Sequence, residues 1–333
     1  MKNKIIVSFS ILLLTYVPIF GQGDAGQAGE FLRYGVGSRP LAMGGAYGAL
    51  ANDATGMYWN PAGIAQLDSG QVSFMLSRIL FEDRYNFISG AVPVKINSTH
   101  NLSIGIGVIY LNSEGYEERD EHNNHKGNFD EVNRAIFIAP AYRYIHNNFE
   151  VNFGLNYKQI MHKINGLHLL ENMKDSDEGA DIGVIINIKN INPSIRLGYT
   201  IQNAGLQPKI TLLSKENIYP ISQRIGLGAI LDRAFSILGY YVDVNTLFDL
   251  VVINETSRNT CINCGVEFLG KNSEHNKRMA IRLGCRDLID IKSVTFGIGI
   301  MWSNFSLDYF WGYWLEDYLN LYNYKNITLS LNL

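Results

Sequence analysis

Three cysteines and a histidine in the last third of the chain are residue types that can bind zinc. Cys261 and Cys264 are separated by two residues, and His275 and Cys285 follow them. A structural zinc site needs four such side chains at tetrahedral positions. However, Cys264 lies on the apolar face of a predicted strand, which sends Cys261 to the opposite face. Residues three apart in a strand are separated by about 10 Å, beyond the roughly 7 Å limit for a disulfide. We therefore expect Cys264 and Cys285 to be small hydrophobic side chains on an apolar surface, and we expect no metal site.

The motifs of common hydrolases, metalloproteases and nucleotide-binding enzymes are missing from the sequence. It contains no Gly-x-Ser-x-Gly, no His-Glu-x-x-His and no phosphate-binding loop. Met43-Gly44-Gly45-Ala46 lacks the Lys-Ser/Thr pair of a Walker sequence. The sequence therefore predicts a protein that is not an enzyme and uses no cofactor, and a loop-borne hydrolase is the alternative.

Charged residues of both signs recur on the polar, glycine-rich face of predicted strands. They are Asp181, Arg196, Arg224, Asp243, Glu267, Arg282 and Asp308. If the strands close into a barrel, this face lines the lumen, where opposite charges can pair and water can enter. These residues are therefore predicted to face the lumen.

Strands are the elements that would position these residues, because apolar and polar residues alternate along most of the chain. In 101–110, Leu, Ile and Val alternate with Ser and Gly, and 324–333 shows the same period of two. About fourteen such segments follow residue 70: 71–80, 84–94, 101–110, 134–144, 149–162, 179–188, 195–202, 221–231, 236–245, 259–269, 279–287, 293–301, 305–311 and 324–333. Most have the roughly 9–11 residues that a tilted strand needs to cross a bilayer.

Short and long connections alternate between these segments. The short turns are 95–100, 145–148, 189–193, 232–235 and 303–304, and the longer polar loops are 111–133, 163–178, 203–219, 246–258 and 312–323. Three connections break the alternation: 81–83 and 288–292 are brief, and 270–277 is long. Outer-membrane barrels have short periplasmic turns and long outer loops, whereas a soluble sandwich has no reason to sort its loops in this way. The sequence predicts an all-β fold, an antiparallel transmembrane β-barrel of about 14 strands. A soluble barrel or sandwich is the alternative.

Composition and the N-terminus restrict the compartment and the partners. Of the 333 residues, 47% are hydrophobic and 18% are charged, and the formal net charge is −3. These values argue against a disordered chain and against a nucleic-acid partner. Lys2 and Lys4 precede an apolar run over 5–17, and Gly21 is a small residue at the expected cleavage position. We expect 1–21 to be a signal peptide, and we expect the mature chain to reach the outer membrane of a Gram-negative type of cell.

The segment between the signal peptide and the first strand, 22–68, differs from the rest of the chain. It is rich in glycine and alanine and poor in charge, so it predicts neither a strong helix nor a lipid-facing strand. Irregular backbone at membrane depth is tolerated where protein or a water-filled cavity surrounds it. We therefore expect 22–68 to be a plug, or hatch, inside a barrel formed by 69–333, and a flexible leader is the alternative.

The hatch segment carries a resemblance to a known family. Its stretches 38–46 and 58–63 resemble the N-terminal region of the PorV/PorQ family of outer-membrane proteins, which is similar in turn to the FadL long-chain fatty-acid transporters. The residues concerned include Arg39, Pro40, Met43, Gly44, Gly45, Asn60, Pro61, Ala62 and Gly63. The resemblance implies a fourteen-stranded barrel with an N-terminal hatch.

The resemblance implies two alternative functions. PorV-like members resemble type IX secretion components, which receive secreted cargo that carries a C-terminal sorting domain. FadL-like members move hydrophobic small molecules through the barrel. A cargo shuttle would bind its partner with outer loops, and the candidate loop is 111–133, which contains Glu114, Glu117, Glu118, Arg119 and Asp120. This charged run is otherwise a solvated loop. The expected partners are outer-membrane lipid and either cargo proteins or hydrophobic small molecules.

Overall fold

The computed structural model describes residues 30–79, 83–166, 173–204, 209–210, 217–218, 221–253, 260–272, 277–288, 293–314 and 323–333. The predicted signal peptide lies outside these residues. The first described segment consists of four short helices, η1 (Glu30–Arg33), α2 (Ser38–Ala42), α3 (Gly56–Trp59) and η2 (Pro61–Gln66). Glycine and proline between and within them prevent a longer helix. We call residues 30–67 the hatch.

Fourteen of the described strands close into an antiparallel barrel. They are β1 (Gln71–Arg78), β2 (Arg84–Lys95), β3 (His100–Arg119), β4 (His125–His146), β5 (Phe149–Asn165), β6 (Met173–Ile188), β7 (Ser194–Ala204), β10 (Ser222–Ile237), β11 (Tyr240–Ile253), β12 (Thr260–Asn272), β13 (Lys277–Arg286), β14 (Ser293–Trp302), β15 (Phe305–Trp314) and β16 (Asn323–Asn332). Each strand pairs with its sequence neighbour in the barrel, and β1 pairs with β16 to close it. The small strands β8 (Lys209–Ile210) and β9 (Asn217–Ile218) pair with each other, apart from the barrel. The predicted fold class is confirmed, and the sandwich alternative is wrong.

Several strands are longer than the sequence predicts. The expected loop 111–133 is strand except for 120–124, because β3 and β4 continue to Arg119 and from His125. The expected turn 232–235 lies within β10, where the register shifts between Leu231 and Phe235. Such extensions are hard to predict, because apolar alternation fades where both faces of a strand are polar.

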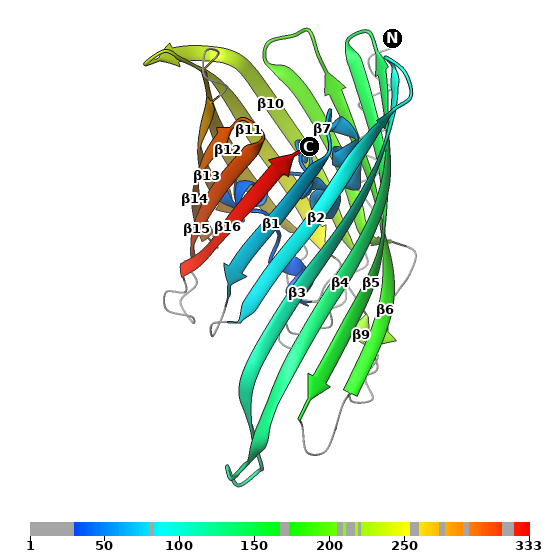
Figure 1. Ribbon diagram of the computed structural model, residues 1–333, viewed down its shortest axis with the longest axis vertical. Helices are drawn as coiled ribbons and strands as arrows, with labels where there is room; N and C mark the ends of the chain where they lie inside the picture. Colours follow the sequence, from blue (N-terminus) through cyan, green and yellow to red (C-terminus); the bar gives the residue numbers. More distant parts are fainter. Residues whose placement is uncertain are drawn as a thin grey trace.

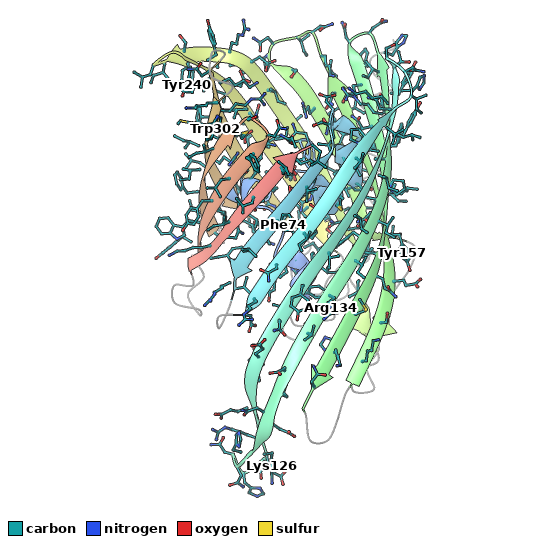
Figure 2. All side chains as sticks on the ribbon, in the orientation of Figure 1. Phe74, Lys126, Arg134, Tyr157, Tyr240 and Trp302 are labelled. Atoms are coloured by element: carbon teal, nitrogen blue, oxygen red, sulfur yellow. The ribbon has the colours of Figure 1, made fainter. Side chains whose placement is uncertain are left out.

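The two faces of the barrel wall differ as the period-two pattern requires. On β1, Phe74 and Leu76 are exposed on the outside, whereas Ser73 and Met75 are buried inside. Figure 2 shows Phe74 and Tyr157 among the side chains on the outer surface of the barrel. Among the described residues, no helix is long and apolar enough to span a membrane.

The two ends of the barrel are unlike. One end, which we call the short-turn end, has two-residue turns at 238–239 and 303–304 and the C-terminal end of β16. At the other end, β3 and β4 project well beyond the remaining strands as one hairpin (Figure 1). We call 112–132 the hairpin and this end the hairpin end.

The hatch lies inside the barrel (Figure 1). All of 40–51 is buried. The core that surrounds the hatch has most of its apolar wall residues on β1–β6, including Tyr85, Phe87, Ile109 and Phe137. Most inward charges of the opposite wall, β10–β15, face the hatch as ion pairs. The interior is therefore mostly apolar along β1–β4, whereas β5, β6 and β10–β15 contribute buried charges.

Candidate functional site at the hatch–barrel interface

Asn60 attaches the hatch to the barrel wall and begins η2. Its side-chain oxygen accepts a hydrogen bond from the Ala62 backbone N–H at 3.1 Å, which caps the helix. Its side-chain nitrogen donates to the carbonyls of Gly48, at 2.8 Å, and Val184 on β6, at 3.2 Å. Pro61 occupies the first helical position, where a missing N–H has no consequence. The Asn-Pro-Ala part of the motif thus joins two hatch segments and one strand.

Two glycines of the barrel wall make room for this motif. A Cβ atom on Gly183 of β6 would lie 2.1 Å from the Asn60 side-chain oxygen. A Cβ atom on Gly154 of β5 would lie 2.2 Å from the Ala62 nitrogen. Within the hatch, a Cβ atom on Gly63 would lie 2.0 Å from the Ala51 carbonyl oxygen. A side chain at Gly154 or Gly183 would therefore push the hatch from the wall, and one at Gly63 would push two hatch segments apart.

The Met43-Gly44-Gly45 part of the motif docks on the opposite wall. Gly44 and Gly45 have φ angles of +65° and +76°, a region that favours glycine. The Gly44 N–H donates to the Thr295 hydroxyl at 3.0 Å, and a Cβ on Gly44 would lie 2.4 Å from the Cys285 carbonyl oxygen. Buried Met43 packs against Gly265 of β12. This turn follows α2, which contains Pro40. Its backbone lies in direct contact with the backbone of the barrel wall.

Arg39 of the hatch forms an ion pair with Glu267 of the barrel wall. Its Nε and Nη2 atoms donate to the two carboxylate oxygens of Glu267 at 2.8 and 2.9 Å. Glu267 also accepts from Arg282 Nε at 2.8 Å and from the Asn245 side chain at 2.7 Å. Arg282 Nη1 donates to Asp308 at 2.6 Å. We call Arg39, Glu267, Arg282 and Asp308 the charged cluster.

Most side chains of the charged cluster are buried between the hatch and the barrel wall. The Glu267 and Arg282 side chains are fully buried, and that of Asp308 is nearly so. Two guanidinium groups, that of fully buried Arg282 and that of Arg39, whose side chain is 19% exposed, therefore share one buried carboxylate. Removing one member of such a set leaves an uncompensated buried charge, which destabilises strongly. The cluster binds the hatch to β12, β13 and β15.

A second ion pair holds the next part of the hatch. Arg224 Nη1 donates to Asp249 Oδ2 at 2.7 Å and to the Gly45 carbonyl at 2.8 Å. The same Asp249 oxygen accepts the backbone N–H groups of Tyr47 and Gly48 at 2.9 and 2.8 Å. Asp249 was missed by the sequence analysis, which placed it in a loop. Asp243 and Asp249 are both odd-numbered residues of β11, so their side chains lie on the same, inward face. This alternation is the signal that would have identified Asp249.

The other predicted lumen charges point inward but lie apart from the charged cluster. Asp181 pairs with Lys158 at 2.7 Å, and Arg196 donates to the hatch residue Gln66 at 2.9 Å. Asp243 pairs with Lys271 on the neighbouring strand. The structure thus places all seven predicted residues inside the barrel and gathers three of them, Glu267, Arg282 and Asp308, around Arg39.

The five hairpin residues of the candidate partner-binding loop lie outside the barrel lumen. Arg119 donates to Glu117 at 2.9 Å, and this bond lowers the Glu117 pKa. Asp120, in the tip, accepts the Asn124 backbone N–H at 2.8 Å, which lowers the Asp120 pKa. The other two, Glu114 and Glu118, lie on β3. Figure 2 shows Lys126 at this tip, far from Trp302 at the short-turn end.

Aromatic side chains meet between the hatch and the barrel wall near the hairpin end. The rings of Tyr34 and Tyr85 lie 5.6 Å apart edge to face, and those of Phe310 and Tyr324 lie 5.2 Å apart. Tyr85 is fully buried and belongs to the same core as Phe310. We call these four residues the aromatic cluster.

No group of His, Cys, Asp and Glu in the described part of the chain could hold a metal ion.

Comparison with known proteins gives a likeness of fold. No protein-family model and no curated protein matches the sequence. The crystal structure of the P. putida toluene transporter TodX has a TM-score of 0.54 and 9% identity, over 90% of this chain and 99% of that one. A second TodX crystal structure has a TM-score of 0.52 and 10% identity, over 94% and 97% of the two chains. A Pseudomonas aeruginosa FadL homologue has a TM-score of 0.49 and 10% identity, over 89% and 97%.

The class that follows is a closed, fourteen-stranded barrel with a hatch inside it, similar in fold to TodX. At 9–10% identity, this likeness concerns the fold. The predicted fourteen-stranded barrel is confirmed, and the FadL-like and PorV/PorQ assignments stay predictions.

Proposed function

We propose that the chain is an outer-membrane protein without catalytic activity that acts in protein export or surface presentation, as PorV/PorQ proteins of type IX secretion do. The exposed apolar band on the strands supports a membrane location. Short turns are periplasmic in outer-membrane barrels, so we assign the hairpin end to the cell exterior. A signal peptide over 1–21 would deliver the chain there.

The single observation that carries this proposal is the fixed hatch combined with the projecting hairpin. Ion pairs of Arg39 with Glu267 and of Arg224 with Asp249, together with the Arg224 bond to the Gly45 carbonyl, hold the hatch against the wall. The hairpin, in contrast, projects from the rim and presents exposed charges and a stacked aromatic pair, Tyr116 and Phe129, whose ring centroids are 5.6 Å apart. A cargo protein with a C-terminal sorting domain would be received on this surface while the barrel stays shut.

The test compares surface proteomes of the wild type, a deletion strain and a strain with a trimmed hairpin. In the trimmed variant, Asn-Gly replaces 117–128, because Tyr116 and Phe129 are register partners that a two-residue turn can join. We expect proteins with C-terminal sorting domains to accumulate in the periplasm of both altered strains. A K126Q variant, with one charge removed at the tip, is the control for barrel assembly.

Two results would contradict the proposal at different levels. Unchanged cargo distribution in the deletion strain would reject the export function. A normal distribution in the trimmed strain, with the barrel present in the membrane, would reject the outer part of the hairpin, 117–128, as the receiving surface.

A second candidate function is FadL-like transport of hydrophobic small molecules. The aromatic cluster favours it, because apolar and aromatic side chains with few polar groups are typical of sites for such molecules. TodX, whose fold the chain shares, is a toluene transporter. Uptake of a labelled monoaromatic hydrocarbon by the deletion strain tests this function. Reduced uptake that returns with the wild-type gene but not with a Y85A variant would support it, and equal uptake in all strains would reject it.

A further inference from the structure

The end of β10 and the start of β11 extend beyond the barrel wall at the short-turn end. Ile230 pairs with Ser194, and it is the last residue of β10 with a register partner on β7. From there on, the described residues pair β10 with β11 alone, up to the turn at 238–239. We call 231–242 the arm. Figure 1 shows the arm bent outward, away from the barrel, and Figure 2 shows Tyr240 on it.

A bulge bends the arm. Three residues of β10, 232–234, lie opposite the single residue Asp243 of β11. Extra residues on one strand bend that strand. Arg233, in the middle of the bulge, has a φ angle of +50°, and its backbone N–H donates to Asp243 Oδ1 at 2.9 Å. The outward direction of the arm is therefore fixed by contacts with the neighbouring strand.

The outer face of the arm is apolar. Phe235 and Ile237 are 48% and 56% exposed. Ile237 is directly opposite Tyr240, so all three side chains share one face. Alternation along β11 from the exposed residue Phe248 places this face on the outside of the barrel. It carries no charge.

The opposite face of the arm is polar. Exposed Ser236 and Tyr241 are register partners on this face. The Arg233 guanidinium carbon lies 5.2 Å from the centroid of the Tyr241 ring. The arm is therefore amphipathic.

A leucine occupies the tip of the arm at a position that disfavours it. Leu238 and Gly239 have φ angles of +49° and +79°, a turn for which Asn-Gly is the preferred pair. The first residues of the turns at 147–148 and 303–304 also have positive φ, but they are Asn147 and Ser303. A positive φ is uncommon for a bulky residue. Because Leu238 is 93% exposed, packing within the described chain does not explain it, and a contact outside the chain would.

We propose that the arm lies on the periplasmic leaflet of the membrane, with Phe235, Ile237 and Leu238 inserted among the phospholipids. The outer face of the arm continues the exposed apolar surface of Ile225 and Leu227 on β10. Because the arm bends outward, this face turns toward the lipid that surrounds the wall, and the polar face turns toward water. Amphipathic helices lie on membranes in the same way, with the apolar face at the boundary of the acyl chains.

The inference rests on the proposed membrane location and on the assignment of the short-turn end to the periplasm. It is independent of what the protein exports or transports.

The test measures the surroundings of nitroxide spin labels on single cysteines of the full chain. The protein is placed in nanodiscs of phosphatidylethanolamine and phosphatidylglycerol, which leave both membrane faces open to water. L238C reports on the tip, S236C is the matched control on the polar face of the same arm, and I298C on the outer wall is the control for lipid contact. The native cysteines are removed by C261A/C264A/C285A.

Collisions with oxygen, which concentrates in lipid, are compared with collisions with a water-soluble nickel chelate. We expect the label at L238C to be shifted toward oxygen, as at I298C, and the label at S236C to be shifted toward nickel. Folding of each variant is checked by its heat-dependent shift in electrophoresis. If L238C does not fold, I237C is measured in its place with the same expectation.

The outcomes separate the arm from the membrane location. Nickel contact at L238C, or at I237C in its place, with oxygen contact at I298C would overturn the inference alone, and the tip would then be available to a soluble partner. Nickel contact at I298C as well would reject the membrane location together with the inference. Equal oxygen contact at L238C and S236C would overturn the placement of the polar face toward water.

Discussion

Substitution of Gly183 by alanine tests the docking of the Asn-Pro-Ala motif. The new Cβ atom would lie 2.1 Å from the Asn60 side-chain oxygen and 2.9 Å from Pro61 Cδ. Ordinary contacts between such atoms are about 3.5 Å, so Asn60 must move by roughly 1 Å or more. The matched control is Gly90→Ala on β2, where the nearest atoms are 3.8 Å away.

The magnitude follows from the hydrogen bonds that Asn60 would lose. Its buried amide makes three, with Ala62, Gly48 and Val184. Each contributes a net of about 0.5–1.5 kcal/mol. Loss of most of them would weaken docking of the hatch by roughly 2–4 kcal/mol.

Hydrogen–deuterium exchange of the purified barrel in detergent measures this change. A loss of that size would accelerate exchange of the hatch amides over 56–67 by about 30- to 900-fold, while the strand amides far from the hatch keep their rates. In Gly90→Ala the hatch rates should match the wild type. Unchanged hatch exchange in a folded Gly183→Ala protein, or equal acceleration in the control, would refute the reasoning.

Three further predictions concern other parts of the molecule. Glu267→Gln should lower the free energy of unfolding by about 3–5 kcal/mol, because two buried guanidinium groups lose their shared carboxylate; a change below about 1 kcal/mol in denaturant unfolding would contradict this. Cys264 and Cys285 are reduced and directly opposite in the register, so a mild oxidant should join them, and mass spectrometry without this cross-link would disprove the predicted proximity. The pKa of Asp120 is lowered from its ordinary 3.8 by the Asn124 N–H, so the carboxylate stabilises the hairpin tip above that pH and loses this effect as pH falls through the lowered pKa. Titration of the Asn124 amide resonance at or above pH 3.8 would contradict this assignment.

The barrel could be predicted because the residues of each strand alternate between the outer surface and the interior of the barrel, and the sequence shows this alternation. A residue such as Phe74 faces outward and its neighbours inward, and this period of two survives without knowledge of the pairing. The inward position of Arg282 and Glu267 follows from the same parity. Parity alone, however, does not say which inward charges meet, because that depends on the order and register of strands far apart in the sequence.

The hairpin and one aromatic residue show where the pattern fails. Beyond residue 111, β3 and β4 project past the apolar band, and polar residues on both faces resemble a loop. Tyr324 begins the last predicted strand segment, 324–333, a position where outer-membrane barrels commonly carry interfacial aromatic residues. Instead it points into the barrel and packs on Phe310, because its parity places it on the inner face with buried Asn326.

The contacts of the hatch explain why its motif contains glycine and alanine at Gly44 and Ala62. Gly44 passes the Cys285 carbonyl, and Ala62 passes Gly154, at distances that leave no room for a side chain on either glycine. The motif in the hatch and the glycines of the wall are therefore two halves of one interface. Sequence analysis recognises the first half as a motif, whereas the second is scattered over several strands and acquires meaning when the barrel closes around the hatch. A change in either half should have the same effect, so a variant of Gly154 and a variant of Ala62 should each loosen the hatch without disturbing the outer surface of the barrel.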